Sequence, residues 1–182
     1  MYTLPCADQL RQRGAEVELL VYPDSKLMHE ALQKGFYVYP VAAKGYLHPW
    51  EVFKLTRLIR SGGFHLIHTQ ASKDLWVLVP ALKAAGSDIP LYMTKQVGSF
   101  IVKKDTLHSW IYSRVTTVFA ISRVIEKNLL DTCPITPDKI ALLHNAVDTN
   151  HFDPAKADRN KLRREFSITD DEVLIGMVAR FS

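Results

Sequence analysis

The sequence contains little cysteine and no long apolar stretch. Its 182 residues include 2 cysteines, Cys6 and Cys133, which form neither a C-x-x-C metal pair nor a disulfide framework. A reducing compartment is therefore the expected setting. No apolar run reaches the length of a membrane span, and the first residues lack the basic and then apolar pattern of a signal peptide. We expect a soluble protein of the cytoplasm.

Several motifs that would indicate a particular chemistry are also absent. The 7 histidines form no H-x-x-x-H pair, so we expect no metal and no other cofactor. The sequence has no G-x-S-x-G, no P-loop and no complete G-x-G-x-x-G. The net charge is +4, but the basic residues are dispersed and there is no helix-turn-helix or zinc finger. These absences argue against nucleic acid as the partner.

What the sequence does contain is an ordinary globular composition, with 47% hydrophobic and 23% charged residues. Short, mostly continuous apolar runs alternate with amphipathic segments, as in parallel strands that are covered on both faces. The expected strands are Val17–Tyr22, Phe36–Val41, Phe64–Ile67, Ile89–Met93, Val115–Ile121, Ile140–Leu143 and Val173–Val178. The expected helices are Leu4–Arg13, Pro49–Arg60, Leu75–Ala85, Thr106–Arg114, Arg123–Leu130 and Lys156–Phe166. The pattern predicts an α/β fold with a doubly wound parallel sheet.

The two ends of this pattern are unusual. The chain opens with a helix, whereas a doubly wound domain normally begins with a central strand. We therefore expect the first strand to be missing, which would leave unpaired strand edges, low stability and self-association through those edges. We expect a truncated Rossmann-like domain over 1–154. A linker helix and the first strand of a second domain, whose remainder is absent, would follow over 155–182.

Polar groups follow four of the predicted strands. They are His68-Thr69-Gln70, Thr94-Lys95-Gln96, Ser122 and His144-Asn145. Open parallel sheets bind ligands at the carboxyl ends of their strands, so these groups could line one rim, although polar residues also end strands for structural reasons alone. Two lysines, Lys103 and Lys104, lie in a loop beyond the fourth strand. They could hold a phosphate or carboxylate, or the loop could simply be solvated.

The segment from His144 to Pro154, HNAVDTNHFDP, resembles the N-G-V-D-x-x-x-F-x-P signature of family-4 glycosyltransferases, which have the two-domain GT-B fold. Other segments agree with the family in order and spacing. They are Leu10–Val17, similar to L-x-x-R-G-H-E-V, Phe64–Thr69, similar to D-I-I-H-x-H, Ala120–Ser122, similar to A-x-S, and Ile175–Ser182, similar to V-G-R-L-S. The resemblance covers nearly the whole chain.

The resemblance implies that the parent protein is a retaining glycosyltransferase. Such an enzyme moves a sugar from a nucleotide-sugar donor to an acceptor, here a glycan, a glycolipid or another cell-envelope precursor. This chain would supply the acceptor-binding half, and it would be inactive without the C-terminal domain that binds the donor. A peripheral position at the inner face of the membrane would suit such acceptors.

The resemblance also implies roles for particular residues, although it assigns no catalytic residue. Arg180 matches an arginine that contacts the donor diphosphate. The residues expected to face an anionic or glycan acceptor are His68, Gln70, Gln96, Lys103, Lys104, Ser122 and Asn145. The family often has histidine at the positions of Gln70 and Gln96 and glycine at that of Ala146, but glutamine also donates and accepts hydrogen bonds.

A second interpretation belongs to a different class of function, a non-catalytic doubly wound binding module. Such a module would explain the alternation of strands and helices. It would not explain why the N-x-V-D and F-x-P elements occur together and are followed by another apolar run.

Overall fold

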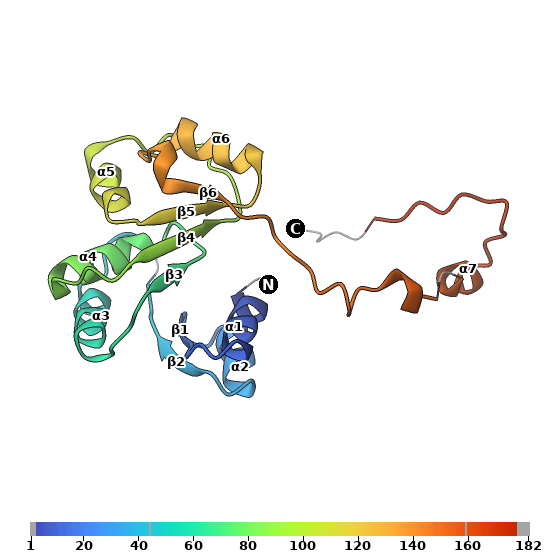
Figure 1. Ribbon diagram of the computed structural model, residues 1–182, viewed down its shortest axis with the longest axis horizontal. Helices are drawn as coiled ribbons and strands as arrows, with labels where there is room; N and C mark the ends of the chain where they lie inside the picture. Colours follow the sequence, from blue (N-terminus) through green and yellow to red (C-terminus); the bar gives the residue numbers. More distant parts are fainter. Residues whose placement is uncertain (1–2, 44, 159, 178–182) are drawn as a thin grey trace. The chain divides into compact units, whose positions relative to one another are not determined.

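The computed structural model describes residues 3–43, 45–158 and 160–177 of the chain. The chain divides into two units, Met1–His144 and Asn145–Ser182. The first unit alternates helices and parallel strands (Figure 1). This confirms the predicted α/β class, while the predicted domain boundary after residue 154 stays a prediction.

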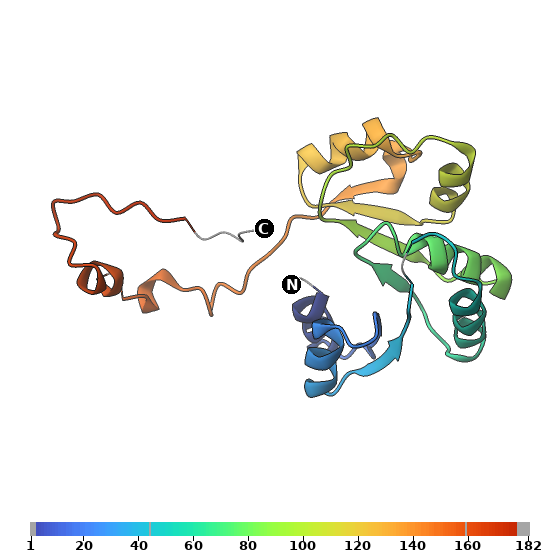
Figure 2. The ribbon, with the colours of Figure 1, turned by 180° about the vertical axis from the view of Figure 1, so that it is seen from behind.

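The first unit begins with a small parallel pair of strands. Helix α1 (Thr3–Gln12) precedes β1 (Glu18–Val21), and α2 (Lys26–Gln33) connects β1 to β2 (Tyr37–Pro40). Figure 2 shows this pair and its two helices from behind. The buried apolar side chains of this part form a small core of their own, consisting of Leu4, Ala7, Leu19, Val21, Ala31 and Phe36.

Helix α2 was not predicted from the sequence. It begins directly after Ser25, an N-cap whose hydroxyl accepts a hydrogen bond from the Met28 N–H at 3.2 Å. Ala31, one turn after Leu27, is fully buried. The apolar positions follow helical spacing, but the segment is too short for that spacing to be conspicuous.

A larger sheet follows, with four parallel strands in the order β3-β4-β5-β6. The strands are β3 (Ile67–Thr69), β4 (Leu91–Lys95), β5 (Thr117–Ala120) and β6 (Ile140–Leu142). The helices before and between them are α3 (Pro49–Ser61), α4 (Leu75–Ala85), α5 (Thr106–Ser113) and α6 (Arg123–Thr132), with a short 3-10 turn, η1 (Pro137–Lys139), before β6. Sequential strand order with a helix in each crossover is the arrangement of parallel α/β folds.

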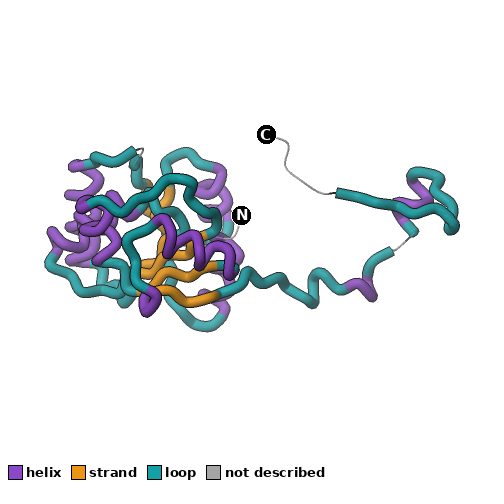
Figure 3. The backbone as a smooth tube through the Cα atoms, turned by 90° about the horizontal axis from the view of Figure 1, so that it is seen from above, coloured by secondary structure: helices purple, strands orange, loops and turns teal. Residues whose placement is uncertain are grey.

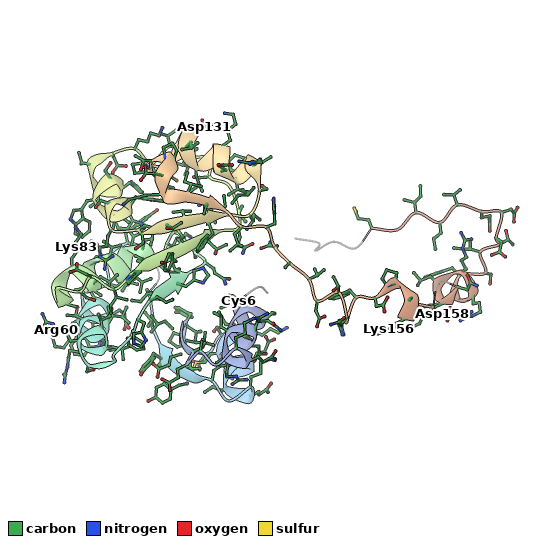
Figure 4. The ribbon with its side chains drawn as sticks, in the orientation of Figure 1. Cys6, Arg60, Lys83, Asp131, Lys156 and Asp158 are labelled. Carbon is green, nitrogen blue, oxygen red and sulfur yellow. The ribbon has the colours of Figure 1, made fainter. Side chains whose placement is uncertain are left out.

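One face of this sheet holds the main core. Leu91 and Met93 of β4 are fully buried and pack in one cluster with buried residues of α3, α4, α5 and α6. Arg60 donates a hydrogen bond to the Ala84 carbonyl at 2.6 Å and links the ends of α3 and α4 (Figure 4). The other face of the sheet presents Tyr92, whose ring stacks on Phe119 with centroids 5.7 Å apart.

Two predicted strand positions were wrong in detail. The third strand was predicted over Phe64–Ile67 but forms at Ile67–Thr69, and the fourth was predicted over Ile89–Met93 but extends to Lys95. Apolar residues mark where a chain is buried, whereas a strand ends where its backbone stops pairing. His68 and Lys95 are therefore part of strands rather than of the loops that follow them.

The second unit contains loop and short helical turns (Figure 3). The helix predicted over Lys156–Phe166 forms only as η2 (Pro154–Lys156) and α7 (Lys161–Glu165), because the Asp158 side chain accepts the N–H of Asn160 and interrupts the helix. The strand predicted from Val173 is wrong for residues 173–177, which are not in a strand. No described backbone pairs with this segment, and a strand requires a partner. Val178 lies outside the described residues.

Within the described residues, β1 pairs only with β2, and β3 pairs only with β4. A two-stranded pair is marginally stable, and its core has 6 buried apolar residues against 17 in the larger cluster. We therefore expect the backbone amides of β1 and β2 to exchange with deuterium markedly faster than those of β4 and β5. Hydrogen exchange under native conditions measures this difference. Equal protection of both sheets would show instead that the first unit opens as one cooperative body.

Candidate functional site

A hollow of about 270 Å³ lies at the carboxyl ends of β3 and β4. Two segments line it, residues 70–73 in the loop after β3 and residues 95–97, which comprise the last residue of β4 and the start of the next loop. Because β3 and β4 are parallel neighbours, their carboxyl ends meet at the same edge of the sheet. Two of the predicted site residues, Gln70 and Gln96, are thereby brought together.

Lys95 is the unexpected residue of this hollow. It is the last residue of β4 and only 8% exposed, although lysine is rarely buried. Its ammonium group lies 3.4 Å from the Ser72 hydroxyl oxygen, which is a long and weak hydrogen bond. Burial lowers the pKa of Lys95, and the positive charge of Lys103 lowers it further.

Lys95 belongs to the polar group Thr94-Lys95-Gln96 that the sequence places at the rim, but it is not among the residues expected to face the acceptor, and Ser72 was not predicted at all. The fourth strand was predicted to end at Met93, which places Lys95 in a loop rather than in the strand. The available signal was strand periodicity, because Leu91, Met93 and Lys95 alternate with Tyr92 and Thr94 and so lie on the same face. A lysine on the same strand face as two core residues, at the end of a parallel strand, indicates that its charged group lies at the edge of the core.

Hydrogen bonds give the loop after β3 a defined shape. The Thr69 hydroxyl donates to the Asp74 carboxylate at 2.5 Å and accepts the N–H of Ala71 at 3.3 Å. At the start of α1, the Thr3 hydroxyl donates to the side-chain carbonyl of Gln70 at 2.8 Å. The wall that contains Gln70 and Ser72 is therefore held from both sides.

The predicted residue His68 lies on the other face of the sheet from Lys95. One of its ring nitrogens is 2.8 Å from the Thr94 hydroxyl, and its ring meets Phe119 edge-on with centroids 6.3 Å apart. These neighbours desolvate one side of the ring, and this desolvation lowers the pKa of His68. His68 is therefore hydrogen-bonded to Thr94 on this face, and it does not line the hollow.

The two predicted lysines differ in position. Lys103 is half-buried, its backbone N–H donates to the Thr132 carbonyl at 2.7 Å, and its charge reaches Lys95. Lys104 is exposed. The loop before them is clamped by Asn128 of α6, which accepts the Ser99 N–H at 2.7 Å and donates to the Ser99 carbonyl at 2.9 Å.

The remaining predicted site residues are not part of the hollow. Ser122 caps α6, since its hydroxyl accepts the Ile125 N–H at 3.3 Å. Asn145 opens the second unit. Arg180 lies outside the described residues. The functional roles predicted for these three residues stay predictions.

The side chains around the hollow are suited to binding rather than to holding a metal. Among the described residues, no group of three or more His, Cys, Asp or Glu could hold a metal ion. Both cysteines are free, with Cys6 on α1 (Figure 4) and Cys133 buried. In the described part of the chain, no helix is long and apolar enough to cross a membrane. The hollow offers amide groups, a hydroxyl and an ammonium to a polar ligand.

Comparison with protein families matches residues 1–151 to the family described as Glycosyltransferase Family 4. No curated protein matches the chain. Among solved structures, a glycosyltransferase from Rickettsia africae ESF-5 is similar with a TM-score of 0.71 and 18% identity, over 93% of this chain and 46% of that one. Anabaena Alr3699/HepE, solved in complex with UDP and glucose, has a TM-score of 0.64 and 16% identity, over 90% of this chain and 46% of that one.

MurG from Acinetobacter baumannii is also similar, with a TM-score of 0.54 and 16% identity, over 84% of this chain and 43% of that one. At these identities the likeness shows the fold alone. The chain spans less than half the length of each of these three proteins.

The environment of His68 predicts how stability depends on pH. Because desolvation lowers its pKa in the folded state, the unfolded chain binds this proton more readily, so stability falls as the pH falls below about 6.5. His68→Gln should lessen this acid-induced loss, so the fall in Tm between pH 7.5 and pH 5 should be smaller in the variant than in the unchanged chain. The exposed His65 provides a matched control, His65→Gln. An equally reduced fall in the control would contradict the assignment to His68.

Proposed function

The chain belongs to glycosyltransferase family 4, and on this premise we propose that its parent protein transfers a sugar from a nucleotide-sugar donor to an acceptor. The observation that carries the proposal is the family match over residues 1–151, together with the hollow at the carboxyl ends of β3 and β4. In parallel α/β sheets this edge is where ligands bind. We propose that the acceptor occupies the hollow.

The finer features of the reaction are part of the same proposal. Transfer proceeds with retention of the anomeric configuration, as the motif resemblance implies. The leaving nucleoside diphosphate gains negative charge and requires a cation close to it, a role we assign to Arg180. The UDP and glucose in the Anabaena structure are ligands of that protein, and they support a nucleotide-sugar donor here.

The hollow favours an acceptor with hydroxyl groups. Gln70 and Gln96 each carry an amide that can donate and accept hydrogen bonds, which suits the hydroxyls of a glycan or glycolipid. We therefore propose that the acceptor binds to the described half of the parent protein and that the donor binds to a second half. This arrangement supports the proposal that this chain alone is inactive.

We also assign the parent protein to the cytoplasm, at the inner face of the membrane, where it would act on cell-envelope precursors. The support is the loop after β4, in which Val97, Phe100, Ile101 and Val102 are all strongly exposed. Phe100 is fully exposed, and the exposed Lys104 follows in the same loop. Apolar side chains beside a cation suit the interface of an anionic bilayer.

We expect the isolated chain of 182 residues to neither hydrolyse nor transfer sugar from any nucleotide-sugar, because it spans less than half the length of the similar solved structures and we assign donor binding to a second half. The parent protein should release nucleoside diphosphate in the presence of its acceptor. The configuration of the product, read by proton NMR from the anomeric coupling, should match that of the donor.

Turnover by the purified chain, lost on a point change within it, would contradict the division into two halves. A parent protein that binds a sugar acceptor but releases no nucleoside diphosphate would favour the alternative, a non-catalytic binding module. Inversion at the anomeric carbon would refute retention alone.

The different positions of Lys103 and Lys104 predict different effects on an anionic acceptor. In the parent enzyme, Lys103→Ala should raise the acceptor KM by about tenfold while the donor KM stays nearly unchanged, because a charge-assisted contact is worth about 1.5–3 kcal/mol. Lys104→Ala removes the same charge from an exposed position and should change the acceptor KM less than about twofold. Equal weakening of donor and acceptor by Lys103→Ala would indicate a general loss of structure.

A further inference from the structure

The ammonium group of Lys95 is buried without a counter-charge. Among the described residues, none of the ion pairs includes Lys95, and its one hydrogen-bond partner is the neutral Ser72 hydroxyl. Burying an ammonium in this way is unfavourable unless another group compensates it. The position therefore requires either an internal explanation or a ligand.

The neighbouring side chains do not supply the missing negative charge. The Cys133 thiol donates a hydrogen bond to the Tyr112 hydroxyl at 3.5 Å, and this contact includes no carboxylate. Burial raises the pKa of Tyr112 far above its ordinary value. Two nearby groups act on the pKa of Lys95: the positive charge of Lys103 lowers it, and Cys133 raises it by a smaller amount. Among the described residues no ion pair includes Lys95, and the stronger of these two influences is a second positive charge.

Lys95 is one of the residues that line the hollow. Lys95 and Ser72 both line it, and Lys73 contributes a further basic side chain to the same wall. None of the ion pairs in the described part of the chain includes Lys73 or Lys103 either. An ammonium and a hydroxyl beside each other can donate to the oxygens of one anionic group, and a charge-assisted bond of this kind is strong where water is partly excluded.

We propose that the hollow at the ends of β3 and β4 is a binding site for one anionic group, a phosphate or a carboxylate, of the sugar acceptor, with Lys95 and Ser72 as its direct ligands. The inference rests on the proposed function only for the identity of the molecule that carries the anion. The anion site itself stands on Lys95 and its surroundings. It differs from the loop lysines predicted from the sequence, because the residue in contact with the anion is a core lysine.

The test uses the chain of 182 residues and inorganic phosphate at constant ionic strength, with sodium chloride as the balancing salt. Two-dimensional NMR should show saturable shifts at residues 70–73 and 95–97. Lys95→Met keeps the length of the side chain and removes the charge, and it should weaken phosphate binding by tenfold or more. Ser72→Ala should weaken binding more modestly. Lys104→Met, which changes the net charge equally from an exposed position, should leave phosphate binding within twofold of the unchanged chain.

Thermal melting separates this interpretation from a merely structural lysine. Without phosphate, Lys95→Met should melt at the same temperature as the unchanged chain or higher, because it removes an uncompensated buried charge. Phosphate should raise the Tm of the unchanged chain but not that of Lys95→Met. A large loss of stability in Lys95→Met, or unaltered phosphate binding by it, would overturn the proposal. So would the absence of saturable binding in the unchanged chain.

Two further arms identify the source of the anion. A sugar phosphate or a uronic acid should compete with phosphate for the hollow, as expected for an acceptor. Displacement by a nucleoside diphosphate but by neither sugar anion would refute the acceptor assignment and point to the donor. Because these measurements need no transfer reaction, a parent protein without glycosyltransferase activity would refute the proposed function and leave the anion site intact.

Discussion

The first unit depends on the burial of β4, which is paired with β3 on one side and β5 on the other. Leu91 and Met93 are fully buried in the core, and burying one such side chain contributes about 1.5–3 kcal/mol to the free energy of unfolding. Residues of α3, α4, α5 and α6 pack with them in one cluster. The hollow lies between the end of β4 and the loop of residues 70–73 that follows its neighbour β3.

The same strand that builds the core also carries Lys95 to its edge. The aliphatic stem of the lysine continues the apolar face of Leu91 and Met93, while the ammonium reaches Ser72 at the wall of the hollow. An ionised group in such a position costs the fold about several kcal/mol when nothing neutralises it. The apolar cluster around β4 must offset that cost, so the fold is less stable than it would be with an apolar residue at this ligand-binding position.

The sequence predicted the kinds of element well because apolar periodicity reports burial directly. It predicted element ends poorly, since the end of β4 depends on pairing with β5, a tertiary property that residue types do not record. Gln70 and Gln96 were predicted together because both follow strands, whereas Lys95 was placed in the loop after β4, because the strand was predicted to end at Met93, and its burial was not foreseen. The apolar run from Val173 was read as a strand, although no described backbone pairs with it.

The clamp between Asn128 and Ser99 has an evolutionary consequence. Both of its hydrogen bonds join the side chain of Asn128 to the main chain of Ser99, so they do not depend on which side chains the loop residues carry. Gly98 is the exception, because an added Cβ would approach Asn128 to 3.2 Å. Mutations can therefore change the side chains at Phe100 and Ile101 while the two hydrogen bonds to Asn128 still hold the loop in place. A lineage of such proteins could diversify what it recognises there without first having to acquire a new scaffold.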